Sequence, residues 1–577
     1  SSWRELLQRL LQNLRLRASH AEALPTLIAL GLICGLLAGG AIIVFRLFIE
    51  STQSLFLPGG DPENYEALAV QWHILLPLAG GAALGVVFQF LPAAARHVGV
   101  VHVMERLAYH QGRLPLRNAL VQFFGAAASI IAGHSMGREG PAIHLGAASG
   151  SLSGQALGLP NNSLRVLAGC GVAAAIAAAF NTPLAGVVFA MEVIMMEYTV
   201  AGFAPVILAA VAATAFSRLV FGPQPAFSVP AIELGSLLEL PYILALGIAI
   251  GALAAAFIVL VRVTGTRLTP LPVWARLTLA GAFTSLLAVP VPQIMGIGYD
   301  TANAALLGQL GLGLLLAVVL AKLLATSAAV GAGLPGGLIG PTLVMGAAAG
   351  GAFGLLAQGM APTHASSAGL YAVLGMGAMM AGALQAPLAA LLAVFELTGN
   401  PHVIMPGMLA VVAAAVSARV IFRQPSVFVV LLRTRGLDYR HDPVVQSLRR
   451  IGVGGVMDKD VAIVPQLLDH ARAREVLTRH PSWLLIPAGA GPATLLPAID
   501  VAQALGEPQT SDPLDLLAIP AQRREAAPVS LQATLQEALD ALDQSGAQAV
   551  YVAEQSDASG GRIHGVLTRE QIERSYR

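Results

Sequence analysis

An arginine and a glutamate stand side by side in an otherwise apolar part of the chain, at Arg138 and Glu139. They belong to the stretch GREGP (137–141), which separates an apolar tract, about 120–132, from a tract of small residues, 142–152. An ionisable pair in such surroundings is costly unless it faces a cavity or finds a partner, so the pair predicts a functional site. The simpler alternative is a turn at a membrane surface with a solvated ion pair.

The glycines and the proline of this stretch predict a break between two helices. Pro141 suits the first turn of the helix that follows, where the backbone N–H groups have no partner within the helix. A helix N-terminus presented inside a membrane attracts anions. We therefore expect the chemistry of this stretch to be anion binding.

The residues just before it fit a different chemistry, because GHSMG (133–137) matches the G-x-S-x-G pattern of serine hydrolases. That pattern requires a strand, a turn and a helix, with a histidine and an acid later in the chain. Ser135 instead ends a membrane-length apolar tract. We expect no enzyme and keep a membrane serine hydrolase at Ser135 as a distant alternative. The chain also lacks the H-E-x-x-H motif, and we identify no metal site.

Composition indicates a membrane protein. Of 577 residues, 56% are hydrophobic and only 11% are charged, whereas a soluble protein carries about a quarter. Mean hydropathy is +0.71, and roughly ten nearly charge-free windows of about 18 residues are long enough to cross a membrane. A net charge of +1 gives no indication of nucleic-acid binding. Cys34 and Cys170 lie in apolar segments and are interpreted as buried thiols.

The strongest pattern is an internal repeat. GREGP (137–141) corresponds to GLIGP (337–341), and NTPLA (181–185) with Glu192 corresponds to QAPLA (385–389) with Glu396. Two halves with interrupted helices at matching positions are typical of transporters and channels, in which the substrate site lies where the broken helices meet. The orientation of the halves in the membrane is not determined by this pattern.

The C-terminal part of the chain has a different composition. From about residue 449 it is charged, with no long apolar runs, and it contains two similar units that each pair short strands with amphipathic helices. It resembles a tandem CBS pair.

Together, GREGP (137–141), GLIGP (337–341) and NTPLAG (181–186) resemble the CLC family of chloride channels and proton-coupled chloride transporters. The resemblance implies a homodimer with one anion pathway per subunit and two inverted halves. It assigns Glu139 as the gating residue, whose carboxylate competes with the anion. Around the anion it places Gly137, Arg138 and Gly140 of the first half, and the backbone N–H groups of Leu338 and Ile339 of the second.

Two departures concern the anion. The family's central serine falls at Val98, next to the retained Gly99, and its central tyrosine falls at Phe428. Losing both hydroxyls removes two hydrogen bonds to the anion, on the order of 1 kcal/mol each. Chloride is the expected substrate, with nitrate, bicarbonate and fluoride as alternatives.

A third departure concerns protons. Coupled exchangers of the family carry an inner glutamate next to the position of Glu192, where this chain has Val193. We therefore favour a passive, voltage- or pH-sensitive channel, with anion/proton exchange as the alternative. A substitute proton path would involve Glu197 or His144. A packing role for Glu192 remains open.

The CBS signature for adenine nucleotides is divided between the two units. The first retains Asp500 and the second retains Thr568, and each lacks the other half of the signature. We expect no tight nucleotide binding and a structural or dimer-stabilising role.

The sequence thus predicts an all-α polytopic membrane protein with two inverted-topology repeats, followed by a cytoplasmic α/β tandem CBS module. It lies in a cell inner membrane with both termini cytoplasmic, binds small inorganic anions and has no nucleic-acid partner. The expected parts are an amphipathic helix (1–20), two membrane repeats (21–225 and 226–425), a linker (426–450) and the CBS pair (451–577).

Overall fold

A computed structural model describes residues 14–15, 18, 24–196, 200–224, 227, 229, 233–362, 365–437, 443–487, 493–506, 513–554 and 562–575. The chain divides into two compact units. The helical unit comprises Ile28–Ser153 and Arg165–Tyr439, and the C-terminal unit comprises Arg440–Arg577 with Ser1–Leu27 and Gly154–Leu164. The amphipathic helix predicted for residues 1–20 falls almost entirely outside the described residues.

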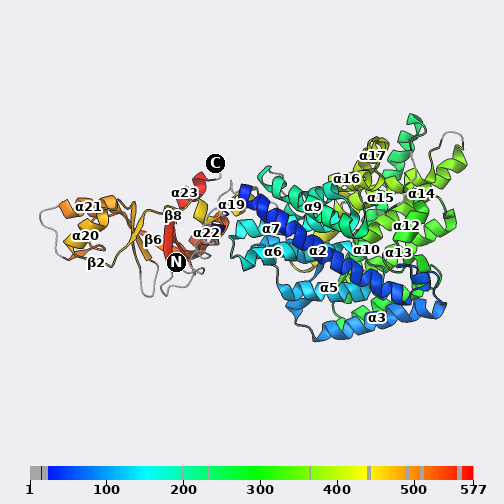
Figure 1. Ribbon diagram of the computed structural model, residues 1–577, viewed down its shortest axis with the longest axis horizontal. Helices are drawn as coiled ribbons and strands as arrows, with labels where there is room; N and C mark the ends of the chain where they lie inside the picture. The colour runs from blue at the N-terminus through cyan, green and yellow to red at the C-terminus, as the bar shows by residue number, and fades with distance from the viewer. Residues whose placement is uncertain are drawn as a thin grey trace. The chain divides into compact units, whose positions relative to one another are not determined.

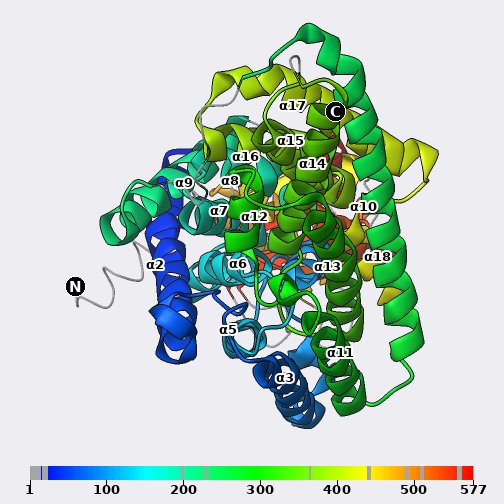
Figure 2. The same ribbon diagram turned by 90° about the vertical axis from the view of Figure 1, so that its right-hand side faces the viewer.

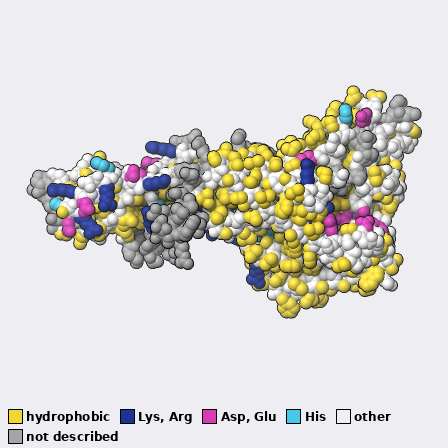
Figure 3. Space-filling model, in the orientation of Figure 1, with side chains coloured by type: hydrophobic (Ala, Val, Ile, Leu, Met, Phe, Trp, Pro, Cys, Tyr) yellow, Lys and Arg dark blue, Asp and Glu magenta, His cyan; other side chains and the backbone are white. Residues whose placement is uncertain are grey.

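The helical unit is built from apolar helices (Figure 1). Among the described residues, eight helices are long and apolar enough to cross a membrane. Large apolar side chains cover much of the visible face of this unit (Figure 3), as expected where lipid replaces water. The principal helices are α2 (Leu24–Phe56), α3 (Val70–Phe90), α4 (Gly99–Tyr109), α5 (Leu116–Ile131), α6 (Glu139–Ala156), α7 (Asn161–Phe180), α8 (Pro183–Phe189), α9 (Val200–Phe221), α10 (Leu240–Leu268), α11 (Val273–Ala288), α12 (Tyr299–Leu306), α13 (Leu312–Ala332), α14 (Ile339–Met360), α15 (Ala368–Leu384), α16 (Pro387–Thr398), α17 (Ile404–Val416) and α18 (Val427–Thr434).

The internal repeat is visible in the order of the helices, since α5 to α8 correspond to α13 to α16. Asn181 and Gln385, at matching positions before the α8 and α16 prolines, both have left-handed backbone conformations, with φ of 60° and 57°. The repeated glycines serve the same packing purpose in both halves. A Cβ on Gly146 would lie 2.2 Å from a carbonyl oxygen of α7, and one on Gly346 would lie 2.3 Å from a carbonyl oxygen of α15. Small residues let such helices approach closely.

Figure 2 shows how the broken helices are enclosed. In this view α6, α12 and α14 lie between α2 on one side and α10 on the other, and α3 and α11 run side by side below them. Every residue of α6 from Glu139 to Ala148 is buried, and so is almost every residue of α14 up to Gly354. The starts of α6 and α14 are therefore held in the interior of the helical unit.

The C-terminal unit is an α/β domain that repeats the order strand, helix, strand, strand, helix. Its main sheet has the order β1-β3-β4-β6-β7-β8, in which β1 pairs parallel with β3 as β6 does with β7. Two apolar cores accompany the two halves. The elements are α19 (Pro443–Arg450), β1 (Val461–Ile463), β2 (Leu467–Leu468), α20 (His470–Leu477), β3 (Trp483–Ile486), β4 (Ala493–Pro497), α21 (Ala498–Gly506), β5 (Leu514–Asp515), β6 (Arg524–Ser530), α22 (Leu535–Ser545), β7 (Ala549–Ala553), β8 (Ile563–Thr568) and α23 (Arg569–Arg574). The predicted α/β module of two similar units is confirmed.

Candidate functional site

The two broken helices meet at a pair of glycines. Gly137 and Gly337 exchange two backbone hydrogen bonds, each with an N···O distance of 2.7 Å. A Cβ on Gly337 would lie 2.6 Å from the backbone nitrogen of Gly140, so a side chain does not fit there. The matching motifs of the two halves therefore form one junction, at which α6 and α14 begin.

The carboxylate of Glu139 occupies the start of α14. Its Oε2 accepts a hydrogen bond from the Gly340 backbone N–H at 3.1 Å, and its Oε1 accepts one from the Tyr299 hydroxyl. Only 1% of Glu139 is exposed. A helix N-terminus attracts negative charge because its first N–H groups have no partner within the helix. The carboxylate thus lies where an anion would bind.

Tyr299 is a functional candidate that the sequence analysis missed. It is the first residue of α12, and its backbone N–H donates to Glu63 Oε2 at 2.9 Å. No repeat counterpart or motif points to it. The one available signal is its position next to an acid, Asp300, between two apolar segments.

The side chain of Arg138 points into a small ion-pair network. Its Nη1 donates to Glu50 Oε1 at 2.8 Å, and the same oxygen accepts from Arg46 Nε at 2.7 Å. The Arg138 guanidinium carbon also lies 5.6 Å from the centre of the Tyr299 ring. Both partners on α2 are far away in sequence. The buried charge is therefore compensated by Glu50, while the backbone of Arg138 remains at the junction.

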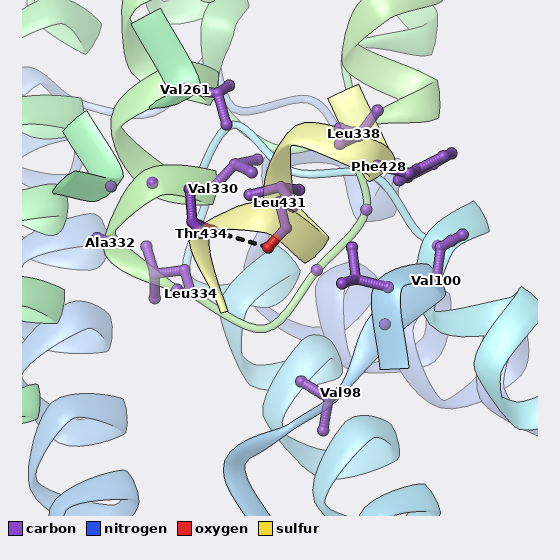
Figure 4. A pocket seen from close by; sticks show the side chains of 18 of the residues that line it. Val98, Val100, Val261, Val330, Ala332, Leu334, Leu338, Phe428, Leu431 and Thr434 are labelled. Atoms are coloured by element: carbon purple, nitrogen blue, oxygen red, sulfur yellow. Dashed lines mark hydrogen bonds between the residues drawn. The ribbon is translucent and has the colours of Figure 1, made fainter. Parts of the chain in front are cut away.

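A cavity of about 320 Å³ extends from this junction. Of the eight predicted anion-site residues, Gly137 and Arg138 do not line it, whereas the other six do: Val98, Gly99, Gly140, Leu338, Ile339 and Phe428. Figure 4 shows Val98, Leu338 and Phe428 among its apolar side chains. Its described lining also includes the basic side chains Arg96, His97, Arg276 and Arg435 and no acidic one. A cavity lined by one sign of charge concentrates ions of the opposite sign, here anions.

The repeat glutamates form reciprocal clamps. Glu192 accepts hydrogen bonds from Leu388 and Ala389, the first N–H groups of α16, at 3.3 and 2.8 Å. Glu396 does the same for Leu184 and Ala185 of α8, at 2.9 and 2.8 Å. Each carboxylate thus caps a helix of the opposite half, which favours the packing role left open by the sequence.

The other residues proposed for a proton path are less informative. Val193 is buried in a π-helical turn, Ala190–Met195, and offers no group that binds a proton. Glu197 lies outside the described residues. His144 on α6 is fully buried, and its Nδ1 accepts a hydrogen bond from the Gly99 N–H at 3.3 Å. His144 therefore links α6 to the cavity wall.

The two candidate nucleotide residues already have local partners. Asp500 accepts a hydrogen bond from the Gln522 N–H at 2.9 Å. Thr568 caps α23, where its side chain accepts from the Gln571 N–H at 3.4 Å. Neither arrangement tests nucleotide binding, which stays a prediction.

Two further polar residues, Ser135 of the hydrolase-like motif and Lys322 of α13, are buried and locally paired. The hydroxyl of Ser135 lies 2.9 Å from that of Thr326. Lys322 Nζ donates to the carbonyl oxygens of Ile294 and Gly296, at 3.2 and 3.3 Å. The lysine is thus held by local backbone acceptors.

Comparison with known proteins identifies the family. Residues 80–419 match the family model described as "Voltage gated chloride channel". A putative chloride channel protein ClcB-like of Ralstonia nicotianae is 34% identical over 387 residues, 66% of this chain and 90% of the relative. An H(+)/Cl(-) exchange transporter ClcA of Vibrio cholerae is 31% identical over 323 residues, 54% of this chain and 69% of the relative.

The fold is shared with solved structures as well. A slow cyanobacterial Cl-/H+ antiporter matches with a TM-score of 0.62 and 24% identity, over 71% of this chain and 97% of that one. The predicted fold class is thereby confirmed, and since members of this family are transporters and channels, the hydrolase alternative at Ser135 is set aside. The chain belongs to the CLC family of anion-transporting membrane proteins.

Proposed function

We propose that this protein exchanges chloride for protons across the membrane, with the Glu139 carboxylate as the gate. The observation that carries the proposal is the position of that carboxylate, which is buried at the start of α14 and bonded to the Gly340 N–H. An ionised carboxylate competes with an anion for the same N–H groups, whereas a protonated one gives up most of that attraction. One side chain therefore responds both to protons and to the anion.

The cavity supports the same proposal. It leads from basic side chains to the junction, where Gly140, Leu338 and Ile339 line it, and the Glu139 carboxylate is bonded to the next N–H group of α14, that of Gly340. An anion that enters from the cavity meets attractive but dispersed charge, which permits binding without trapping. A pathway that stays closed until Glu139 is protonated is expected to work as a carrier and not as an open channel.

The relatives favour exchange over the passive channel that the sequence alone suggested. Several are named H(+)/Cl(-) exchange transporters, whereas the one from Ralstonia nicotianae is named a putative chloride channel protein.

Uncoupled chloride passage is the second candidate, and Val193 is the observation in its favour. An apolar side chain where the resemblance places an inner proton acceptor leaves Glu139 without the family's usual supply of protons from that side. Exchange then requires a different route, for which His144 is our candidate because it bonds to Gly99 of the cavity wall.

The anion is proposed to be chloride, with bicarbonate, nitrate and fluoride as alternatives. Val98 and Phe428 line the cavity without a hydroxyl group, so neither side chain donates a hydrogen bond to an anion there. Backbone N–H groups would then supply most of the binding, and selectivity would be weaker than with two hydroxyl donors.

Further parts of the proposal follow from the family. We expect a homodimer with one anion pathway per subunit. We also expect a bacterial inner membrane, cytoplasmic termini and a tandem CBS module that binds adenine nucleotide weakly or not at all.

Reconstitution in liposomes tests the proposal. Chloride flux and internal pH are recorded together under a chloride gradient, while valinomycin and potassium clamp the voltage. Exchange predicts proton movement against the proton gradient in fixed proportion to chloride flux. Chloride flux with no proton movement would favour uncoupled passage. Flux of another anion and none of chloride would show that the other anion is the substrate.

A further inference from the structure

Two histidines and a glutamate gather beside the cavity, at His97, His102 and Glu105. One potential metal-ligating atom of each lies within 4.8 Å of the others. His102 and Glu105 share one face of α4, three residues apart, and His97 lies just before the helix starts. Only His97 of the three lines the cavity. The three residues are spaced five and three positions apart, which matches no metal-binding motif, so the sequence did not indicate this cluster.

The distances suit a small transition-metal ion. His97 Nδ1 and His102 Nδ1 lie 3.8 and 3.7 Å from the same carboxylate oxygen, Glu105 Oε2. Ligand atoms bound at about 2.0–2.1 Å to one tetrahedral zinc ion stand roughly 3.3–3.4 Å apart. Small side-chain rotations would therefore bring the three groups to bonding distance, leaving a fourth position for water.

The hydrogen bonding of His102 points to a missing ligand. The residue is only 3% exposed, yet neither ring nitrogen has a hydrogen-bond partner among the described residues. The carboxylate at 3.7 Å is too distant for a hydrogen bond. A buried polar group without a partner calls for an explanation, and a bound ion is one.

From this arrangement we propose that His97, His102 and Glu105 form a zinc-class divalent-cation site on the wall of the anion cavity. Two imidazoles and one carboxylate are ligands that zinc accepts readily. Arg435 limits the affinity, because its Nη1 lies 3.4 Å from the same Glu105 oxygen and a bound cation must displace it. Since Arg435 also lines the cavity, metal binding would change the charge that an entering anion meets.

Metal titration of the full-length protein in detergent tests the site, with no polyhistidine tag on the chain and with residual metal removed. Co²⁺ is added first, because its visible absorption reports tetrahedral coordination, and Zn²⁺ is then added to displace it. We expect one ion per chain in the wild type and a loss of affinity of at least roughly tenfold in His102→Ala and in His97→Ala. His402→Ala, an exposed histidine elsewhere, serves as the control and should bind normally.

Arg435→Gln separates this proposal from a general effect of mutation. Removing the competing cation should tighten metal binding several-fold, an improvement that misfolding does not produce. The proposal is overturned if His102→Ala and His97→Ala bind as the wild type does, or if Arg435→Gln leaves the affinity unchanged or weaker. It is equally overturned if the wild type shows no tetrahedral Co²⁺ spectrum.

Discussion

The hydroxyl of Tyr299 is predicted to hold the gate closed. It donates a hydrogen bond to Glu139, whose other carboxylate oxygen accepts from the Gly340 N–H. Tyr299→Phe removes this donor and keeps the ring. A hydrogen bond to a charged group contributes about 1.5–3 kcal/mol. Since 1.4 kcal/mol is a factor of ten, the population with the carboxylate in its site should fall roughly 10- to 150-fold relative to the open form.

Initial chloride efflux from liposomes at neutral pH measures this change. Tyr299→Phe should increase efflux wherever opening limits the rate, and the increase should vanish when Glu139 is already Gln. Tyr371→Phe is the matched control, because Tyr371 donates to Glu239 at 2.5 Å, in another buried tyrosine–glutamate pair. An equal increase in the control, or in the Glu139→Gln background, would refute the role of Tyr299.

Three further predictions concern packing, capping and nucleotide binding. Gly346→Ala places a Cβ about 2.3 Å from a backbone oxygen, which should destabilise the protein by about 1–3 kcal/mol and lower its thermal unfolding temperature in detergent. Gly359→Ala in the same helix is the control, because its Cβ meets no atom within 4 Å and should leave that temperature unchanged. Equal stability of the two variants would contradict the packing argument. Glu192→Gln should destabilise the protein by about 1–3 kcal/mol, because the charge-assisted hydrogen bonds from Glu192 to α16 are weakened. The ratio of protons to chloride ions transported should stay unchanged. A changed ratio would instead assign Glu192 to the proton path. ATP at micromolar concentration should not shift the unfolding temperature of the full chain, and a saturable shift would show that the C-terminal module binds nucleotide.

Much of the site could be predicted because its components are local. Glycines and a proline around an ionisable pair specify a helix break, and the recurrence of the pattern 200 residues later, at 137 and 337, implies that the two breaks act together. The bridge between Gly137 and Gly337 joins the equivalent positions of the two repeats.

The remaining features depend on contacts between distant segments. The Tyr299 hydroxyl reaches Glu139 across 160 residues, and Arg138 reaches Glu50 across 88. Neither pairing produces a periodic pattern or a motif in the sequence. The position of Glu192 suggested either packing or transport, and the hydrogen bonds to α16 that favour packing are visible only in the structure. The spacing of His97 and His102 likewise matches no metal-binding motif. The two side chains come together only because of the loop before α4.

The relatives favour exchange, whereas Val193 favours a passive channel. Val193 suggested a passive channel because it cannot carry a proton, but an absent relay excludes only that one route. In our proposal the Glu139 carboxylate is the group that both ions meet, whichever route supplies the proton.

The most direct test of this account is chloride-driven proton movement in liposomes, compared between the wild type and Glu139→Gln. The account predicts that the wild type moves protons uphill in fixed proportion to chloride. It predicts that Glu139→Gln passes chloride at all pH values and moves no protons, because an amide neither closes the site as a charge nor carries a proton. Uphill proton movement that persists in Glu139→Gln, or chloride flux that keeps its wild-type pH dependence there, would contradict the central claim.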